Sequence, residues 1–484
     1  MKRKRFQGWS KRKRIVRGIA GILALLYIAV IVWHTYKPLP PGVSYAGNTH
    51  SVENIDMLYD LSYAQDMKGS EKEYELQIFE KIYDMIDQAE EFIVLDLFLF
   101  DNYNDQKTAF PAVAELLTDH LLKKKQENPE IPIYFITDPL NTGYGSYGSQ
   151  LLGTLEDAGV EVIFTDLDQL RDSTPLYSGF YRVLFQWFDT DSQGWIANGM
   201  SSDAPKLSIA SYLEMMNIKA NHRKTVVTEK EAIISSANPH NASGLHGNMA
   251  FTVSGPIIND ILESEEAVSK FSGGPEFPRI QAAEQEGNYK AQYLTESQIF
   301  DALIQDIGKA KKGDSIWLAM FYIAESDVVE ALKEAANRGV EVRMILDPNE
   351  NAFGTEKTGL PNRPVVNEMY EEANENMKVR WYNTVVGQFH TKSIMIKTTE
   401  ETIVMGGSAN YTERTLDNYN LEADIRIVAP NGSELVGEMD SYFNRLWTNE
   451  DALYTLDVEK FQDEFSFWQR GVYGFQKIFK LTTY

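Results

Sequence analysis

The sequence of 484 residues contains no cysteine. Disulfide bonds, a cysteine nucleophile and thiolate metal ligands are therefore excluded. Basic side chains are scarce after the first 17 residues: nine of the 46 Lys and Arg residues lie there, so 37 basic side chains face 70 acidic ones in the rest. So acidic a chain is a poor binder of nucleic acid, because binding the phosphate backbone requires clustered positive charge.

A long apolar run follows the basic segment. Residues 18–36, GIAGILALLYIAVIVWHTY, are long enough to cross a bilayer and end with the interfacial residue types Trp33 and Tyr36. The positive-inside rule predicts a cytoplasmic segment at 1–17, a transmembrane anchor at 18–36 and an extracytoplasmic remainder. A cleaved signal peptide is the alternative, but its small-x-small pattern at 44–46 lies far beyond the apolar run. We expect an uncleaved, single-pass anchor in the cell membrane.

The chain beyond this anchor repeats one pattern twice. ELQIFEKIYDMIDQAEE from residue 75 and ESQIFDALIQDIGKAKK from residue 296 both space apolar residues as in a helix. Each is followed by an apolar strand, a helix and a strand that ends in a similar turn, which matches Asp138 to Asp347. The order strand, helix, strand, helix, strand predicts two fused α/β units with mainly parallel central strands. The predicted boundaries are a linker at 37–70, domains at 71–285 and 286–450, and an aromatic C-terminal segment at 451–484.

The two halves also share a pattern that contains reactive side chains. Residues 221–238 read NHRKTVVTEKEAIISSAN, and residues 389–410 read FHTKSIMIKTTEETIVMGGSAN. The matching positions are His222 and His390, Lys224 and Lys392, Ser236 and Ser408, and Asn238 and Asn410. A lone His-x-Lys most often belongs to an ordinary strand, but two copies at the same point of a repeat favour a functional site.

These residue types suit one kind of chemistry. Residues two apart in a strand point to the same face, and a hairpin would return the Ser and Asn beside the histidine. Two such halves would combine two imidazoles with two ammonium groups. That set suits a phosphodiester: one histidine attacks phosphorus, the other protonates the leaving oxygen, and the lysines and asparagines stabilise the phosphate. Because the lysines supply positive charge, we expect no metal and no cofactor.

The duplicated pattern resembles the HKD motif of the phospholipase D superfamily over roughly residues 70–450, and NHRK with the membrane segment is most similar to the cardiolipin synthase branch. The resemblance implies two fused phospholipase D-like α/β/α sandwich domains that complete one site within one chain. It implies a phosphohistidine on His222 or His390, with the other histidine as the general acid; because the N-terminal copy is often the nucleophile in this family, His222 is assigned that role and His390 the role of the acid. It further implies phosphate binding by Lys224, Lys392, Asn238, Asn410, Ser236 and Ser408, and a histidine-orienting role for Glu422.

The sequence departs from the family pattern in several places. The aspartate usual seven residues after the histidine is replaced by Glu229 and by Lys397. The first-half counterpart of Glu422 is Asn248 or Ala250. Cardiolipin synthases commonly have two N-terminal membrane helices, and this sequence shows one.

The first half carries an insertion, residues 168–215, between Asp138 and His222. It contains LYSGFYRVLFQWFDT, with the aromatic residues Tyr177, Phe180, Tyr181, Phe185, Trp187 and Phe188. Such a stripe is usually core, but its position also suits an acyl-chain wall or a membrane-facing lid. His240 and His246, just after the first motif, either line the site or are incidental loop residues.

Three functional classes compete. The favoured one is a membrane-anchored phosphatidyltransferase or phospholipase D, whose partners are the membrane and a phospholipid substrate. The second is an extracytoplasmic nuclease of the same superfamily, which the acidic composition disfavours. The third is a non-catalytic relative that binds phospholipid. Hydrolysis and transphosphatidylation use the same residues, so the sequence leaves both open.

Overall fold

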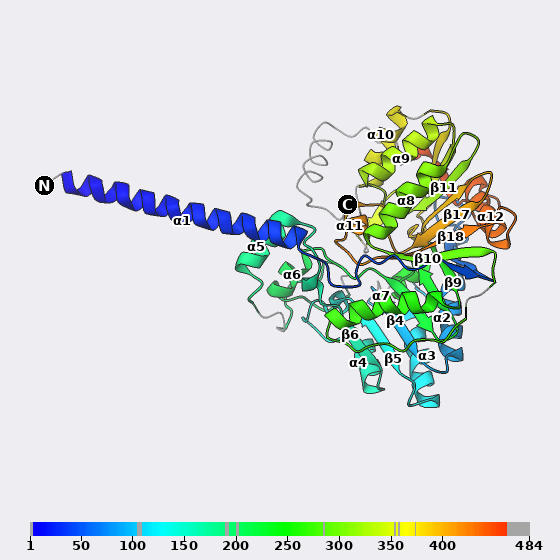
Figure 1. Ribbon diagram of the computed structural model, residues 1–484, viewed down its shortest axis with the longest axis horizontal. Coiled ribbons are helices and arrows are strands. Elements are labelled where there is room, and N and C mark those ends of the chain that lie inside the picture. The colour runs from blue at the N-terminus through cyan, green and yellow to red at the C-terminus, as the bar shows by residue number, and fades with distance from the viewer. Residues whose placement is uncertain are drawn as a thin grey trace.

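The computed structural model describes residues 3–103, 109–188, 193–199, 203–283, 286–352, 355–356, 359–372 and 374–461. Most of the aromatic C-terminal segment predicted at 451–484 therefore lies outside the described residues. Helix α1 (Arg3–Tyr36) projects from a body that contains two β-sheets (Figure 1). Within this helix, Lys11–Tyr36 is long and apolar enough to cross a membrane.

The first half forms a mixed sheet of eight strands within the described residues. In spatial order these are β3 (Glu73–Leu76), β2 (Met57–Tyr63), β9 (Asn248–Val253), β8 (Ala232–Ser235), β7 (Lys224–Thr228), β4 (Ile93–Leu97), β5 (Ile133–Thr137) and β6 (Glu161–Phe164). Strands β4, β5 and β6 are parallel, and all other neighbours pair antiparallel.

The second half forms a related sheet of nine strands in the described part of the chain. In spatial order these are β1 (His50–Val52), β10 (Tyr289–Thr295), β18 (Ala423–Ala429), β17 (Thr402–Gly407), β16 (Lys392–Lys397), β11 (Ser315–Met320), β12 (Glu341–Leu346), β15 (Met377–Tyr382) and β19 (Thr455–Asp457). Only β11, β12 and β15 are parallel. A separate pair comprises β13 (Asn351–Ala352) and β14 (Thr355–Glu356). The prediction of mainly parallel central strands therefore holds for three strands per sheet. The strands that follow the two histidines, β7 and β16, instead form antiparallel hairpins with β8 and β17.

Helices cover the outer faces of both sheets. The first sheet packs against α2 (Gln77–Gln88), α3 (Val113–Glu127) and α4 (Gln150–Asp157), and the second against α8 (Ser297–Lys309), α9 (Ser326–Asn337) and α10 (Asn362–Glu372). Two longer helices, α7 (Ile257–Phe271) and α12 (Glu434–Thr448), instead contribute to the core between the sheets. Shorter helices are α5 (Pro175–Leu184), α6 (Ile209–Met215) and α11 (Glu413–Leu416), with 3₁₀ turns at Pro139–Thr142, Leu167–Gln169, Asn241–Leu245 and Val458–Phe461.

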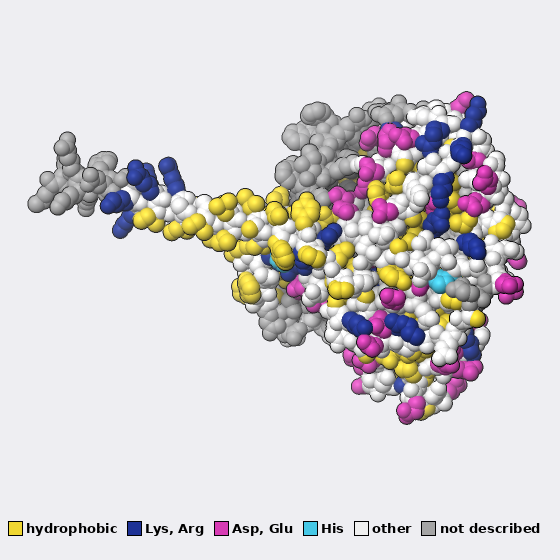
Figure 2. Space-filling model, viewed as in Figure 1, with side chains coloured by type: hydrophobic (Ala, Val, Ile, Leu, Met, Phe, Trp, Pro, Cys, Tyr) yellow, Lys and Arg dark blue, Asp and Glu magenta, His cyan; other side chains and the backbone are white. Residues whose placement is uncertain are grey.

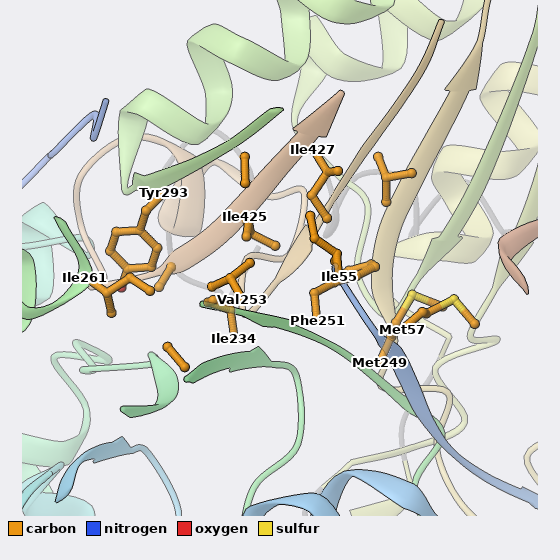
Figure 3. Close-up of a cluster of buried hydrophobic side chains, with 14 of the residues drawn as sticks. Ile55, Met57, Ile234, Met249, Phe251, Val253, Ile261, Tyr293, Ile425 and Ile427 are labelled. Atoms are coloured by element: carbon orange, nitrogen blue, oxygen red, sulfur yellow. The ribbon is translucent and has the colours of Figure 1, made fainter. Parts of the chain in front are cut away.

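An apolar core joins the two sheets face to face. Figure 3 shows first-sheet side chains such as Phe251 and Val253 beside the second-sheet side chains Tyr293, Ile425 and Ile427. Each of these five side chains is at most 2% exposed. The two halves thus share one core, and the predicted class of two α/β units behind an apolar helix is confirmed.

The prediction that residues 37–70 form a linker is wrong, because two strands of this segment belong to the sheets. Strand β1 pairs with β10 of the second half, whereas β2 pairs with β9 and β3 of the first half. The prediction missed both because β1 has only three residues and β2 is interrupted by Asp60, so neither shows a long apolar run. The segment after α1 is therefore built into both sheets.

Candidate active site

The two predicted histidines meet where the parallel strands of the two halves end. His222 and His390 lie just before β7 and β16, which begin two residues later at Lys224 and Lys392. The centroids of the two imidazole rings are 6.4 Å apart, and the ring planes are inclined by 72°. The fold thus brings together two side chains that are far apart in the sequence.

Matched aspartates hold the backbone immediately before each histidine. Asp138 follows β5 and accepts the backbone N–H of Asn221 at 2.8 Å. Asp347 follows β12 and accepts the backbone N–H of Phe389 at 2.7 Å. Burial raises the pKa of each carboxyl to about 7. The repeated turn therefore has a structural purpose in both halves, which is to fix the approach to the histidine.

The two lysines lie in equivalent buried positions. Lys224 Nζ and Lys392 Nζ donate to the carbonyl oxygens of their respective histidines, at 2.6 and 2.7 Å. Each ammonium also lies over a phenylalanine ring, Phe98 at 5.1 Å and Phe321 at 5.2 Å. Burial lowers the pKa of Lys224 to about 7, and burial together with Lys224 lowers the pKa of Lys392. Burial thus disfavours the two ammonium forms in the empty site, and an arriving anion would stabilise them.

Each histidine is oriented by a group from the opposite half. His222 Nδ1 lies 2.9 Å from Glu422 Oε2. His390 Nδ1 lies 3.0 Å from the carbonyl oxygen of Ser236 and 3.1 Å from Asn248 Oδ1. Because a backbone carbonyl can only accept, Nδ1 of His390 carries the hydrogen and Nε2 is the free nitrogen. The orienting residue of the first half is thus Asn248 and not Ala250.

Burial dominates the ionisation of this group. It lowers the pKa of both His222 and His390 and raises the pKa of Glu422. The two lysines lower the pKa of His222 further and oppose the rise at Glu422. Burial therefore favours the neutral form of both histidines and of Glu422 in the empty site, and the lysines oppose this effect at Glu422 only in part.

The two serines contact the orienting side chains. Ser236 Oγ donates to Asn248 Oδ1 at 3.1 Å, and Ser408 Oγ donates to Glu422 Oε2 at 2.5 Å. Both hydroxyls are fully buried. Each predicted serine thus supports the acceptor that holds the histidine of the other half.

The predicted asparagines lie beside this group with different partners. Asn410 Oδ1 accepts the backbone N–H of Tyr322 at 3.3 Å. Asn238 is 4% exposed, and its buried Oδ1 has no hydrogen-bond donor among the described residues.

Of the two loop histidines, only one lies against a catalytic candidate. The ring centroid of His246 is 6.0 Å from that of His390, and burial lowers the pKa of His246 to about 3. His240 instead pairs with Asp101 at 3.5 Å and contacts Ser243. The sequence offered both histidines as candidates and gave no signal to choose between them.

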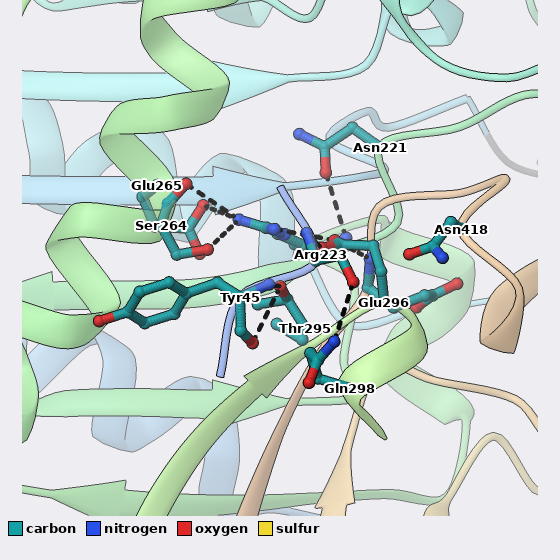
Figure 4. A network of polar contacts seen from close by, with 12 residues as sticks. Tyr45, Asn221, Arg223, Ser264, Glu265, Thr295, Glu296, Gln298 and Asn418 are labelled. Carbon is teal, nitrogen blue, oxygen red and sulfur yellow. Dashed lines mark hydrogen bonds and ion pairs between the residues drawn. The ribbon is translucent and has the colours of Figure 1, made fainter. Parts of the chain in front are cut away.

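Sequence reasoning missed a buried ion-pair network behind the first motif. Arg223 alternates with His222 and Lys224, so it points to the other side of the chain and is fully buried (Figure 4). Its guanidinium lies 3.3 Å from Glu265 and 2.8 Å from Glu296. Glu296 Oε1 also accepts the backbone N–H of Glu422 at 3.1 Å. The network therefore connects the backbone of the first motif to the residue that orients its histidine.

The residues that replace the family's aspartate lie away from the histidines. Glu229 is in the hairpin turn after β7 and accepts the backbone N–H groups of Glu90 and Glu91 at 2.9 and 3.2 Å. Lys397 is the last residue of β16 and lies 2.5 Å from Asp440 of α12. Both replacements thus lie at the ends of β7 and β16 that are farthest from the histidines.

A metal-binding cluster is not found in the described part of the chain: no three His, Asp or Glu side chains there are grouped to hold an ion.

Comparison with known proteins identifies the family of the second half. Residues 279–447 match the family model described as cardiolipin synthase, PLD-like domain. The second half of the chain therefore contains a phospholipase D-like domain. This domain supports an enzyme of the phosphatidyltransferase or phosphodiesterase type. No curated protein matches this phospholipase D-like sequence at a significant level.

Among three similar solved structures, the first shares the fold of this chain. Phosphatidylserine synthase from Haemophilus influenzae Rd KW20 has a TM-score of 0.57 and 11% identity, covering 89% of this chain and 95% of its own. Polyphosphate kinase from Porphyromonas gingivalis has a TM-score of 0.42 and 10% identity, covering 89% of this chain and 56% of its own. NucT from Helicobacter pylori has a TM-score of 0.26 and 20% identity, covering 33% of this chain and 96% of its own.

Proposed function

We propose that the protein is a membrane-anchored enzyme that transfers the phosphatidyl group of a phospholipid through a phosphohistidine. The observation that carries the proposal is the pair formed by His222 and His390, whose ring centroids are 6.4 Å apart. At this separation a single phosphoryl group can contact one imidazole on each side. The cardiolipin synthase description of the family model and the fold shared with a phosphatidylserine synthase support a phospholipid substrate.

The two histidines differ in their orienting partners, and this difference assigns their roles. Attack by a neutral imidazole on phosphorus places positive charge on the ring. Glu422 compensates that charge on His222, because the new imidazolium favours the carboxylate form of its partner; it also holds the Nδ1–H of His222, which leaves Nε2 free to attack. His390 is held by neutral groups only. The bound phosphate favours its imidazolium form, which takes up a proton at Nε2 and then protonates the leaving oxygen. We therefore assign His222 as the nucleophile.

The remaining residues divide into those that bind phosphate and those that position others. Lys224 and Lys392 supply positive charge to the phosphate oxygens, and Asn238 and Asn410 supply amide groups. We assign Ser236 and Ser408 a positioning role, because their hydroxyls already donate to the orienting side chains.

The anchor is part of the proposal. The apolar helix Lys11–Tyr36 follows a basic N-terminal segment, which favours a cytoplasmic N-terminus and an extracytoplasmic site by the positive-inside rule. A site tethered beside the bilayer receives its substrate from the lipid surface. The acceptor that resolves the phosphohistidine is then water or an alcohol such as glycerol.

The experiment uses the full chain reconstituted in vesicles. It is incubated in parallel with phosphatidylglycerol, with phosphatidylethanolamine and with single-stranded DNA, with and without added glycerol. We expect lipid turnover that is lost in both His222→Ala and His390→Ala, and a product that changes with the acceptor. Degradation of DNA alone would overturn the proposal in favour of a nuclease. Lipid binding without turnover would identify a non-catalytic relative.

A further inference from the structure

Helix α5, in the insertion of the first half, lies directly against the apolar helix α1. The hydroxyl of Tyr27 donates to the carbonyl oxygen of Leu176 at 2.7 Å. Gly179 approaches α1 so closely that a Cβ added there would lie 2.5 Å from Ile31 Cγ1. These contacts fix α5 beside the second half of the apolar segment 18–36.

The length of this apolar segment determines the depth at which α5 lies. A helix needs about 20 residues to cross the hydrocarbon core of a bilayer. The last charged residue before the segment is Arg17, and Lys37 is the next one after it. The whole of 18–36 is therefore needed to span the core, so Tyr27 lies at the middle of the span and Ile31 lies within the outer leaflet. Because α5 packs at these two residues, α5 is at the level of the lipid as well.

The side chains of α5 agree with such an environment. Its surface exposes large apolar residues, which continue past its end, and we call this set the α5 apolar surface: Leu176 (42% exposed), Phe180 (46%), Val183 (42%), Leu184 (48%), Trp187 (78%) and Phe188 (62%). The charged residue of α5, Arg182, is turned inward, is 5% exposed and pairs with Asp172 at 3.0 Å. Figure 2 shows hydrophobic side chains along α1 and on the adjoining surface of the body.

We propose that the α5 apolar surface inserts into the acyl-chain region of the membrane that α1 spans. This proposal rests on the proposed membrane anchor and adds a second, monotopic contact to it. A single helix leaves the body free to tilt, whereas two contacts fix one orientation relative to the bilayer. The contact is coupled to the site, because Thr174 at the start of α5 donates to the carbonyl oxygen of Asn217, five residues before His222. The α5 apolar surface thus holds the first motif at a fixed height above the lipid.

The absence of cysteine makes the test direct, because any introduced thiol is unique in the chain. The full chain carrying Leu184→Cys or Trp187→Cys is labelled with a small fluorophore and reconstituted in vesicles of phosphatidylglycerol and phosphatidylethanolamine. Some of the lipids carry a spin-label quencher on the acyl chain. Leu116→Cys on α3 is the matched control, since Leu116 is also apolar and is 45% exposed. Leu23→Cys reports on α1 itself.

We expect acyl-chain quenching at Leu23→Cys, Leu184→Cys and Trp187→Cys that is several-fold stronger than at Leu116→Cys. Quenching at Leu23→Cys without quenching at the two α5 positions overturns the proposal and leaves the anchor intact. No quenching at Leu23→Cys overturns the anchor and this proposal together. Efficient cross-linking of two Leu184→Cys chains through a short bifunctional reagent, in place of quenching, would show that a second copy covers the surface and would also overturn it. None of these readouts depends on lipid turnover.

Discussion

Glu422 and His222 belong to different halves of the chain, yet their side chains are 2.9 Å apart. The reverse contact joins His390 to Asn248 at 3.1 Å. The halves therefore exchange orienting groups, and neither half contains a complete histidine site. Because one exchanged group is a carboxyl and the other an amide, two similar domains yield two chemically different histidines.

The first prediction concerns this asymmetry. Glu422→Gln removes the negative charge beside His222, so we expect kcat for lipid turnover to fall about 100-fold, as for the loss of one acid–base partner. Vesicle assays with the purified variant measure this. Asn248→Asp is the matched control, since it adds a carboxylate at His390 and leaves His222 paired. Equal activity of Glu422→Gln and the unaltered protein would refute the assigned role.

A substrate with a good leaving group separates the two histidines. A nitrophenyl phosphodiester needs little protonation of its leaving oxygen, so His390→Gln should still release a burst of nitrophenol and accumulate a phosphorylated protein. His222→Gln should give neither, because it lacks the nucleophile. Rapid-mixing absorbance and mass spectrometry measure the two signals. The opposite pattern would make His390 the nucleophile.

The pH dependence of kcat/KM follows from the buried lysines. Burial lowers the pKa of Lys224 in the empty site to about 7, so its ammonium form is lost as the pH rises through neutrality. A phosphodiester keeps its single negative charge over this range, so kcat/KM should fall above about pH 7 as Lys224 deprotonates. Bound phosphate favours the ammonium form, so the fall in kcat should occur at higher pH. Lys224→Arg should be slower, but its kcat/KM should not fall above pH 7, because a guanidinium does not deprotonate. If the fall persists unchanged in this variant, Lys224 is not its origin.

Lys397 should be dispensable for chemistry, although it replaces the family's aspartate. Its ion pair with Asp440 is about one-third exposed, and pairs of this kind contribute about 0–1 kcal/mol to stability. We therefore expect Lys397→Ala to retain the kcat of the unaltered protein, whereas Lys392→Ala loses most of it. Parallel kinetics of the two variants test this. A large loss of kcat in Lys397→Ala would place that end of β16 in the mechanism.

Arg223 should matter for stability. Arg223→Met leaves the buried carboxyls of Glu265 and Glu296 without their cation, so we expect the free energy of unfolding to fall by about 3–5 kcal/mol. Arg343→Met is the control, because its pair with Glu341 is partly exposed and about 0–1 kcal/mol is expected. Denaturant unfolding of the detergent-solubilised full chain compares them. Equal losses in the two variants would contradict the buried network.

The sequence was sufficient for features that repeat within the chain. The two His-x-Lys stretches, the helices before them and the matched aspartates all occur twice, and the duplication made each copy evidence for the other. The resemblance to the phospholipase D superfamily implied that Glu422 orients a histidine but left its partner undefined. Which histidine it contacts depends on how the two halves pack together, and packing between halves leaves no periodic signal in the sequence.

Features that differ between the two halves were missed or left open. The roles of Asn248 and Arg223 depend on contacts between residues distant in the chain. The strands at 50–52 and 57–63 are short and are stabilised by partners in separate sheets, so their local composition resembles that of a linker. For His246, the decisive information was which side of a loop faces the site.

Strand β1 sets an order for the folding of the newly made chain. Residues 50–52 emerge soon after the apolar helix, but their partner strand comprises residues 289–295 of the second half. Until that strand has left the ribosome, β1 stays unpaired, and an open strand edge invites aggregation. The first sheet needs no strand of the second half, because β2 pairs within it, but a fragment cut after the first half would retain a strand that has lost its sheet.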